Sequence, residues 1–271
     1  MRSWWTNAGL QSVPIDLVNL ALSAARLALK PRIGLVLKGS IDQVRTAAAR
    51  TKFLPIRGVE IIGYDEPTDP NCAFLSSMHA LRYLRVFARP LTDIEAIESL
   101  ERLQALKIQH VGKRQSISLS FQKFSVLDSV ALEWFHGAEN VFDASPVRST
   151  SLTYCPIKTS EAFLRLSNLV RICLSSSDFT EINAFAQMRN LVWIALHDLR
   201  NLINYTGLSG HKNIRFLWIE RCQKLRSLEF LQGISSLETL KVLDCGEITD
   251  IKALASLRNL RHIHSTAILE S

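Results

Sequence analysis

The sequence has 271 residues, 47% hydrophobic and 21% charged, and its 32 basic against 25 acidic residues give a formal net charge of +7. This composition excludes a disordered chain, and no apolar run reaches the roughly 18 to 20 residues that a membrane-spanning helix needs. Five cysteines without a paired spacing exclude a disulfide scaffold and a Cys-based zinc site, so we expect a cytoplasmic protein.

The first predicted element is a helix over residues 14–30, a segment rich in Leu and Ala. We expect residues 1–31 to form an N-terminal cap in which this helix covers the apolar edge of the region that follows. A secretory signal peptide is the alternative for the same segment. Against it, Asp16 lies where the apolar run should begin, and Arg2 is the only positive side chain upstream.

A repeated apolar pattern, Leu-x-x-Leu-x-Leu, occupies residues 32–271. Its clearest copies start 22, 23 and 23 residues apart, at Leu169, Leu191, Ile214 and Leu237. Earlier and more degenerate copies in the same phase start at Ile56, Leu81, Leu103, Leu127 and Val147. With an opening row at residues 35–37 and a closing row at residues 260–263, the sequence predicts about eleven rows, each containing one β-strand.

Between the rows, apolar residues recur every three positions, as in the run Leu225, Leu228, Leu231, Ile234 and Leu237. Three residues per turn is the spacing of a 3₁₀-helix, so the pattern predicts short 3₁₀ or turn returns rather than long α-helices. Neither a strand nor a return can bury its apolar edge alone. Successive repeats must therefore stack into an α/β solenoid.

These rows resemble the leucine-rich repeat family over roughly residues 32–265. The short repeats, with returns such as Thr249-Asp250-Ile251, are similar to its internalin-like and phosphatase-regulator-like subclass. The resemblance implies a curved parallel β-sheet on the concave face and 3₁₀ or turn returns on the convex face. The family's Asn or Cys position holds Cys155, Cys222 and Cys245, and in no row does it hold Asn.

No catalytic motif is present: the sequence has no Gly-rich phosphate loop, nucleophile elbow or HExxH. His262-x-His264 could place two imidazoles on one face of a strand, but no third ligand follows. The three repeat cysteines are interpreted as buried structural thiols, since a redox or metal role needs an exposed cluster. We therefore expect neither an enzyme, nor a cofactor, nor a metal.

The candidate binding residues are at the third, fifth and seventh positions of each row, which point away from the core and are called outward positions here. Trp193, Phe216 and Trp218 occupy such positions on adjacent rows. Exposed clustered aromatics are typical of protein interfaces, although a covering flank or loop is the alternative. The predicted protein-binding residues are Trp193, His197, Phe216, Trp218, Glu220, Arg171, Lys241, Tyr83 and Phe87.

The expected function is the recognition of a folded protein partner through the concave face, by a chain that is a monomer when free. The resemblance implies an inhibitor, an adaptor or an immunity-type protein that sequesters an enzyme or toxin. A cryptic enzyme and a nucleic-acid-binding scaffold are the alternatives. The scaffold would use a basic edge at the second position of the rows, formed with gaps by Arg57, Arg82, Arg148, Arg215 and Arg261.

Overall fold

The computed structural model describes residues 26–30, 34–50, 54–63, 70–88, 91–109 and 117–266. Its contacts divide the chain into two compact units. Unit 1 comprises residues 1–129 and 135–141, and unit 2 comprises residues 130–134 and 142–271. Among the described residues, no helix is both long and apolar enough to cross a membrane.

Unit 1 is built on strands that pair in the order of the sequence. They are β1 (Arg26–Lys30), β2 (Gly34–Gly39), β3 (Ile56–Ile62), β4 (Tyr83–Phe87) and β5 (Ala105–Gln109). Strands β2 to β5 run parallel, and β1 is antiparallel to β2. The returns of this unit are the α-helix α2 (Ile41–Arg50) and the 3₁₀ segments η1 (Ala73–Ser77), η2 (Ile94–Ser99) and η3 (Phe121–Lys123).

Unit 2 repeats one strand and one 3₁₀ return per coil. Its strands are β7 (Ser149–Thr153), β8 (Arg171–Ser175), β9 (Trp193–His197), β10 (Phe216–Glu220), β11 (Thr239–Leu243) and β12 (His262–Ser265), and neighbours pair in parallel. Its returns are η5 (Glu161–Arg165), η6 (Asn183–Gln187), η7 (Thr206–Leu208), η8 (Glu229–Leu231) and η9 (Lys252–Ser256). Strand β6 (Ser129–Glu133) and η4 (Ala138–Asp143) contain residues of both units.

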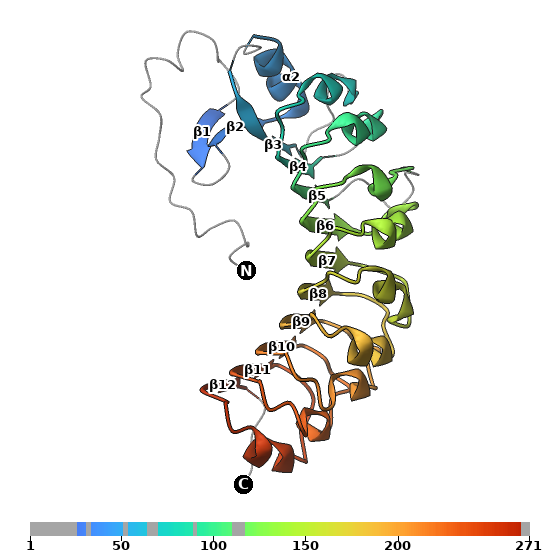
Figure 1. The fold of residues 1–271 in the computed structure, drawn as a ribbon, viewed down its shortest axis with the longest axis vertical. Helices are drawn as coiled ribbons and strands as arrows, with labels where there is room; N and C mark the ends of the chain where they lie inside the picture. Colours follow the sequence, from blue (N-terminus) through green and yellow to red (C-terminus); the bar gives the residue numbers. More distant parts are fainter. Residues whose placement is uncertain are drawn as a thin grey trace. The chain divides into compact units, whose positions relative to one another are not determined.

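The predicted rows form the core of each unit except the closing row, whose Ile263 is 46% exposed. The strands lie on one side of the coils and the returns on the other (Figure 1). Leu217 pairs with Leu240 across β10 and β11, and both are fully buried. The degenerate rows are buried as well, including Leu127, Val130 and Leu132. The period of three is also confirmed, because every member of the run from Leu225 to Leu237 is at most 2% exposed.

Asparagine side chains link neighbouring coils of unit 2 just before the strands. Each donates a hydrogen bond from Nδ2 to a backbone carbonyl of the preceding coil, at 2.6 to 3.0 Å: Asn168 to Ser145, Asn190 to Ser167, Asn213 to Arg189 and Asn259 to Ser235. These bonds pair carbonyls of turn residues that lie ahead of the strands, outside the strand ladder.

The predicted helix over residues 14–30 is wrong over its last five residues. Residues 26–30 form β1, whose partner is β2, and residues 14–25 lie outside the described part of the chain. Leu27 and Leu29 alternate with other residues at a strand's period of two, and Pro31 follows directly. Gly34, with a φ of 93°, pairs with Lys30 where the two strands meet.

The return between β2 and β3 is the α-helix α2, whereas the sequence predicted short 3₁₀ or turn returns. Its first turn carries a capping box: Gln43 N donates to Ser40 Oγ at 3.3 Å, and Ser40 N donates to Gln43 Oε1 at 2.9 Å. Ile41, Val44 and Ala47 supply its buried face.

Replacing Thr150 by Val is expected to stabilise unit 2 by about 1 kcal/mol. Thr150 occupies a leucine position of its row, is fully buried, and its Oγ1 has no hydrogen-bond partner among the described residues. Valine keeps the shape and removes the unsatisfied hydroxyl. Chemical denaturation measures the change, and the outward Thr153→Val should be nearly neutral. A loss of stability in Thr150→Val would show that the hydroxyl is satisfied in solution.

Candidate functional site

The predicted aromatic residues meet on the outward face of unit 2. The parallel register places Arg171, Trp193 and Phe216 directly opposite one another on β8, β9 and β10. Two residues further along the strands, Trp218 lies opposite Lys241 on β11. These five residues are called the cation–aromatic cluster, and the sequence prediction that they lie together agrees with this register.

Trp193 and Phe216 form a stacked pair at the start of their strands. Their ring centroids are 5.2 Å apart and their planes are inclined by only 7°. The guanidinium carbon of Arg171 lies 5.1 Å from the Trp193 ring centroid and forms a cation–π contact with it. Both rings remain partly exposed, whereas the Arg171 side chain is exposed.

Trp218 lies at the centre of the cluster. The residue opposite it on β9 is Ala195, whose small side chain leaves room for the indole. The Lys241 ammonium lies 4.8 Å from the Trp218 ring and 5.9 Å from the Phe216 ring, so one cation contacts two aromatic faces. Trp218 Nε1 is buried and has no hydrogen-bond partner among the described residues.

His197 packs against Trp218 and is itself only 5% exposed. The imidazole meets the indole edge to face, with centroids 4.7 Å apart and planes at 86°. Its Nδ1 lies 3.4 Å from a Glu220 carboxylate oxygen, and Arg221 Nη1 donates to the other oxygen of the same carboxylate. Burial lowers the pKa of His197, and the Glu220 charge opposes this only in part. The imidazole is therefore neutral near pH 7.

A second buried histidine of unit 2, His211, is also held in its neutral form. Its Nε2 lies 3.1 Å from the Met188 carbonyl oxygen, and the backbone N–H of Asn213 donates to its Nδ1 at 3.3 Å. Burial lowers the pKa of His211, although the Met188 contact opposes the shift. Protonation would place an N–H against the Asn213 N–H.

Acidification from about pH 7 to pH 5 is therefore expected to lower the melting temperature. Both histidines have lowered pKa values in the folded state, so below the unfolded value of about 6.5 the unfolded chain binds more protons and the free energy of unfolding falls. The double variant His197→Gln/His211→Gln should show a flatter pH dependence in thermal melts. His262→Gln, at an exposed position, is the control and should match wild type. An unchanged slope in the double variant would contradict the assignment.

The other two predicted binding residues are on β4 of unit 1. Tyr83 is only 2% exposed, because its neighbours in register, Gly58 and Ala105, let the ring pack down onto the sheet. Burial, followed by the Glu60 carboxylate, raises the pKa of Tyr83. Tyr83 therefore offers no ring surface to a partner. Phe87, by contrast, is partly exposed, and the Arg85 guanidinium lies 5.9 Å from its ring centroid.

The basic edge is interrupted in unit 2. Arg148, Arg215 and Arg261 are exposed at the second position of their rows. In the rows between them, the same position holds Val170, Val192 and Glu238. Arg215 Nη1 also lies 3.4 Å from a Glu238 carboxylate oxygen. These three arginines thus form no continuous cationic track for a phosphate backbone.

The repeat cysteines have protonated thiols, and those of Cys155 and Cys222 are buried whereas Cys245 is partly exposed. Cys222 Sγ lies 3.6 Å from the Glu220 carbonyl oxygen and 3.7 Å from that of Leu196. Burial raises the pKa of Cys155 and of Cys222 to about 12 and also raises that of Cys245. In the described ranges, no three His, Cys, Asp or Glu side chains gather as metal ligands. These environments agree with a structural role for the thiols.

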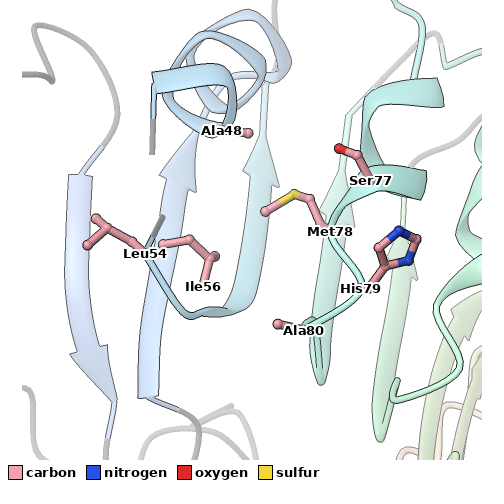
Figure 2. Close-up of a pocket in the computed structure, with 7 residues that line it drawn as sticks. All are labelled: Ala48, Leu54, Ile56, Ser77, Met78, His79 and Ala80. Carbon is pink, nitrogen blue, oxygen red and sulfur yellow. The ribbon is translucent and has the colours of Figure 1, made fainter. Parts of the chain in front are cut away.

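Unit 1 carries a pocket of about 410 Å³ between α2 and the residues that follow η1. Its seven lining residues are Ala48, Leu54, Ile56, Ser77, Met78, His79 and Ala80. Figure 2 shows Met78 extending toward β3 and α2, whereas His79 points the other way. His79 is the one titratable side chain of this lining, so the pocket offers no acid–base pair.

Comparisons with known proteins identify relatives in fold. A scan against models of protein families and a search of curated proteins give no match. Among solved structures, internalin C2 of Listeria monocytogenes has a TM-score of 0.52 and 21% identity, covering 72% of this chain and 83% of that chain. The internalin InlF of the same organism has a TM-score of 0.42 and 16% identity, covering 84% and 85%. A leucine-rich repeat protein of Leptospira interrogans has a TM-score of 0.44 and 14% identity, covering 85% and 77%.

Proposed function

We propose that this chain, a leucine-rich repeat solenoid similar in fold to an internalin, is a non-catalytic module that binds a folded protein. The cation–aromatic cluster on the outward face of unit 2 carries the proposal. Trp and Arg dominate the binding energy of protein interfaces when they lie centrally on a surface that a partner can cover. Here two tryptophans, a phenylalanine, an arginine and a lysine meet on four neighbouring strands.

The dimensions of the cluster favour a protein over a small molecule. From β8 to β11 it spans three strand spacings, about 14 Å at roughly 4.8 Å each. Its side chains stand on an open sheet face, whereas small-molecule sites are concave and enclose most of the ligand. A protein epitope can cover such a face and exclude water around the central ring.

Two reactive side chains near the cluster, those of His197 and Cys222, are buried, which supports a binding role rather than catalysis. His197 is buried beneath Trp218, with its Nδ1 facing Glu220. Glu220 is in turn held by Arg221. The nearby thiol of Cys222 has a pKa of about 12 and is protonated at neutral pH. Neither the imidazole nor the thiol is presented to a substrate.

As a finer proposal, binding sequesters the partner in the cytoplasm, in the manner of an inhibitor or an immunity-type protein. A chain whose described residues offer a binding face, with the neighbouring His197 and Glu220 already engaged with each other, can change a partner's activity by covering its surface. All five cysteines lie in the described part of the chain and none is in a disulfide, which suits a reducing compartment.

The test uses the full chain as an immobilised bait against extract of the source cells. The bait Trp193→Ala/Phe216→Ala removes the stacked pair together, so that no single ring is left unpaired. The control bait Arg148→Ala/Arg261→Ala changes two exposed residues at the row edge of the same unit. A protein that wild type and control retain, and the aromatic variant loses, supports the proposal. Retention by all three baits, or capture of nucleic acid that only the control loses, overturns it.

A further inference from the structure

We infer that the partner presents acidic side chains to the cation–aromatic cluster, an inference that rests on the proposed function and specifies its partner. The cluster combines positive charge with aromatic rings whose faces are already in contact with other groups. The cations attract anionic groups directly, and rings whose faces are occupied expose mainly their electropositive edges.

The contacts within the cluster cover ring faces on both sides of the aromatic stack. One face of Trp193 stacks on Phe216, and the Arg171 guanidinium lies 5.1 Å from the same indole. The Lys241 ammonium lies over both Phe216 and Trp218. Aromatic faces carry the negative part of the ring quadrupole and aromatic edges the positive part. With faces engaged, the rings offer a partner mainly their electropositive edges.

The charges at the outward positions add to this field. Across β7 to β11 the fully charged outward side chains are Arg171, Lys241 and Glu220. The Glu220 carboxylate is only 16% exposed and is already neutralised by Arg221. Within the described residues, no carboxylate forms an ion pair with Lys241, so its ammonium is available to one from a partner.

The spacing of the two cations predicts how far apart the partner's acidic side chains would be. Arg171 and Lys241 are three strands apart, about 14 Å at roughly 4.8 Å per strand, and Lys241 lies two residues further along, so their backbones are about 16 Å apart. An extended segment that crosses the strands spans that distance in about five residues, at roughly 3.3 to 3.6 Å per residue. Two carboxylates about five residues apart would therefore reach both cations.

The same geometry disfavours single-stranded nucleic acid, which also carries negative charge. Proteins bind its bases by stacking them on open aromatic faces. Here Trp193 and Phe216 stack on each other, and cations cover neighbouring faces, so a base would have to break existing contacts. Carboxylates need only approach the edges and the ammonium.

The experiment measures binding of a short, fluorescently labelled poly-glutamate peptide to the purified full chain at low salt. An oligothymidylate of equal charge is the competing probe. The variant Arg171→Gln/Lys241→Gln removes the two cluster charges, and Arg148→Gln/Arg261→Gln removes two matched charges at the row edge. We expect the peptide to bind more tightly than the oligonucleotide, with a loss of about tenfold in the cluster variant and less than about twofold in the edge variant.

Three results would overturn the inference: no measurable binding of the peptide, tighter binding of the oligonucleotide, or an equal loss in the two charge variants. Bait capture separates this failure from failure of the proposed function. A partner lost by Trp193→Ala/Phe216→Ala but kept by Arg171→Gln/Lys241→Gln means that the aromatic interface is correct and its acidic complement is not. A partner kept by both means that the interface itself is wrong.

Discussion

Replacing Leu240 by Asp is expected to unfold the coils around β11, with a loss of more than about 4 kcal/mol in the free energy of unfolding. Leu240 is fully buried and lies in register between Leu217 on β10 and Ile263 on β12. A carboxylate there would be desolvated among apolar side chains, with no cation in those positions to pair with it. Circular dichroism during chemical denaturation measures the loss.

Lys241 is the matched control because it is the next residue on the same strand and points outward. Lys241→Ser should leave the denaturation midpoint nearly unchanged, since the side chain is only partly buried. If the two variants lost equal stability, the assignment of inward and outward positions on β11 would be wrong.

The second large effect is on binding: Trp218→Ala should weaken the affinity for the captured partner about thirtyfold, or roughly 2 kcal/mol. The indole is the central ring of the cluster, and its removal leaves the Lys241 ammonium and the edge of His197 without their aromatic contact. Isothermal titration calorimetry measures the affinity.

Two controls separate binding from folding in that experiment. Trp218→Phe keeps an aromatic face beneath Lys241 and should retain most of the affinity. The melting temperature of Trp218→Ala should stay close to wild type, because Leu217 and Ile219, on either side of it in the sequence, supply the core contacts of β10. Full affinity in Trp218→Ala would show that the cluster is not part of the interface. Loss of the fold in this variant would show that the indole is a core residue.

The repeating part of the fold is predictable because two periods occur in register with each other. A row such as Leu237, Leu240 and Val242 predicts a strand with one buried face, and apolar residues every three positions predict the return. The N-terminal elements deviate from that repeat. The Ser40–Gln43 pair has the sequence signature of a capping box, but the period of three in the other repeats predicts 3₁₀ returns and therefore does not predict α2. The alternation of Leu27 and Leu29 competes with a helical interpretation of the same Leu- and Ala-rich segment.

The candidate site was predictable in its members but not in their exposure. The row positions alone place Trp193, Phe216 and Trp218 on one face. Burial of Tyr83 depends on Gly58 and Ala105 in the neighbouring rows, so its own row gives no sign of it. Arg221 was missed because it follows the last outward position, where the backbone turns with a φ of 52° and the side chain returns to Glu220.

That turn recurs in every described coil from β7 to β11, at the residue after the strand. The left-handed conformation is adopted there by Tyr154, Ser176, Asp198, Arg221 and Asp244. Four of their backbone N–H groups extend the strand ladder by one more bond, to the carbonyl oxygens of Ser175, His197, Glu220 and Leu243. None of the five is glycine, although glycine adopts this conformation at lower cost. The column therefore retains a side chain in each coil, and these side chains are an aromatic, a hydroxyl, two carboxylates and a guanidinium. If the proposed interface is correct, substitutions along this border are expected to change which partner binds while the sheet and its central rings stay the same.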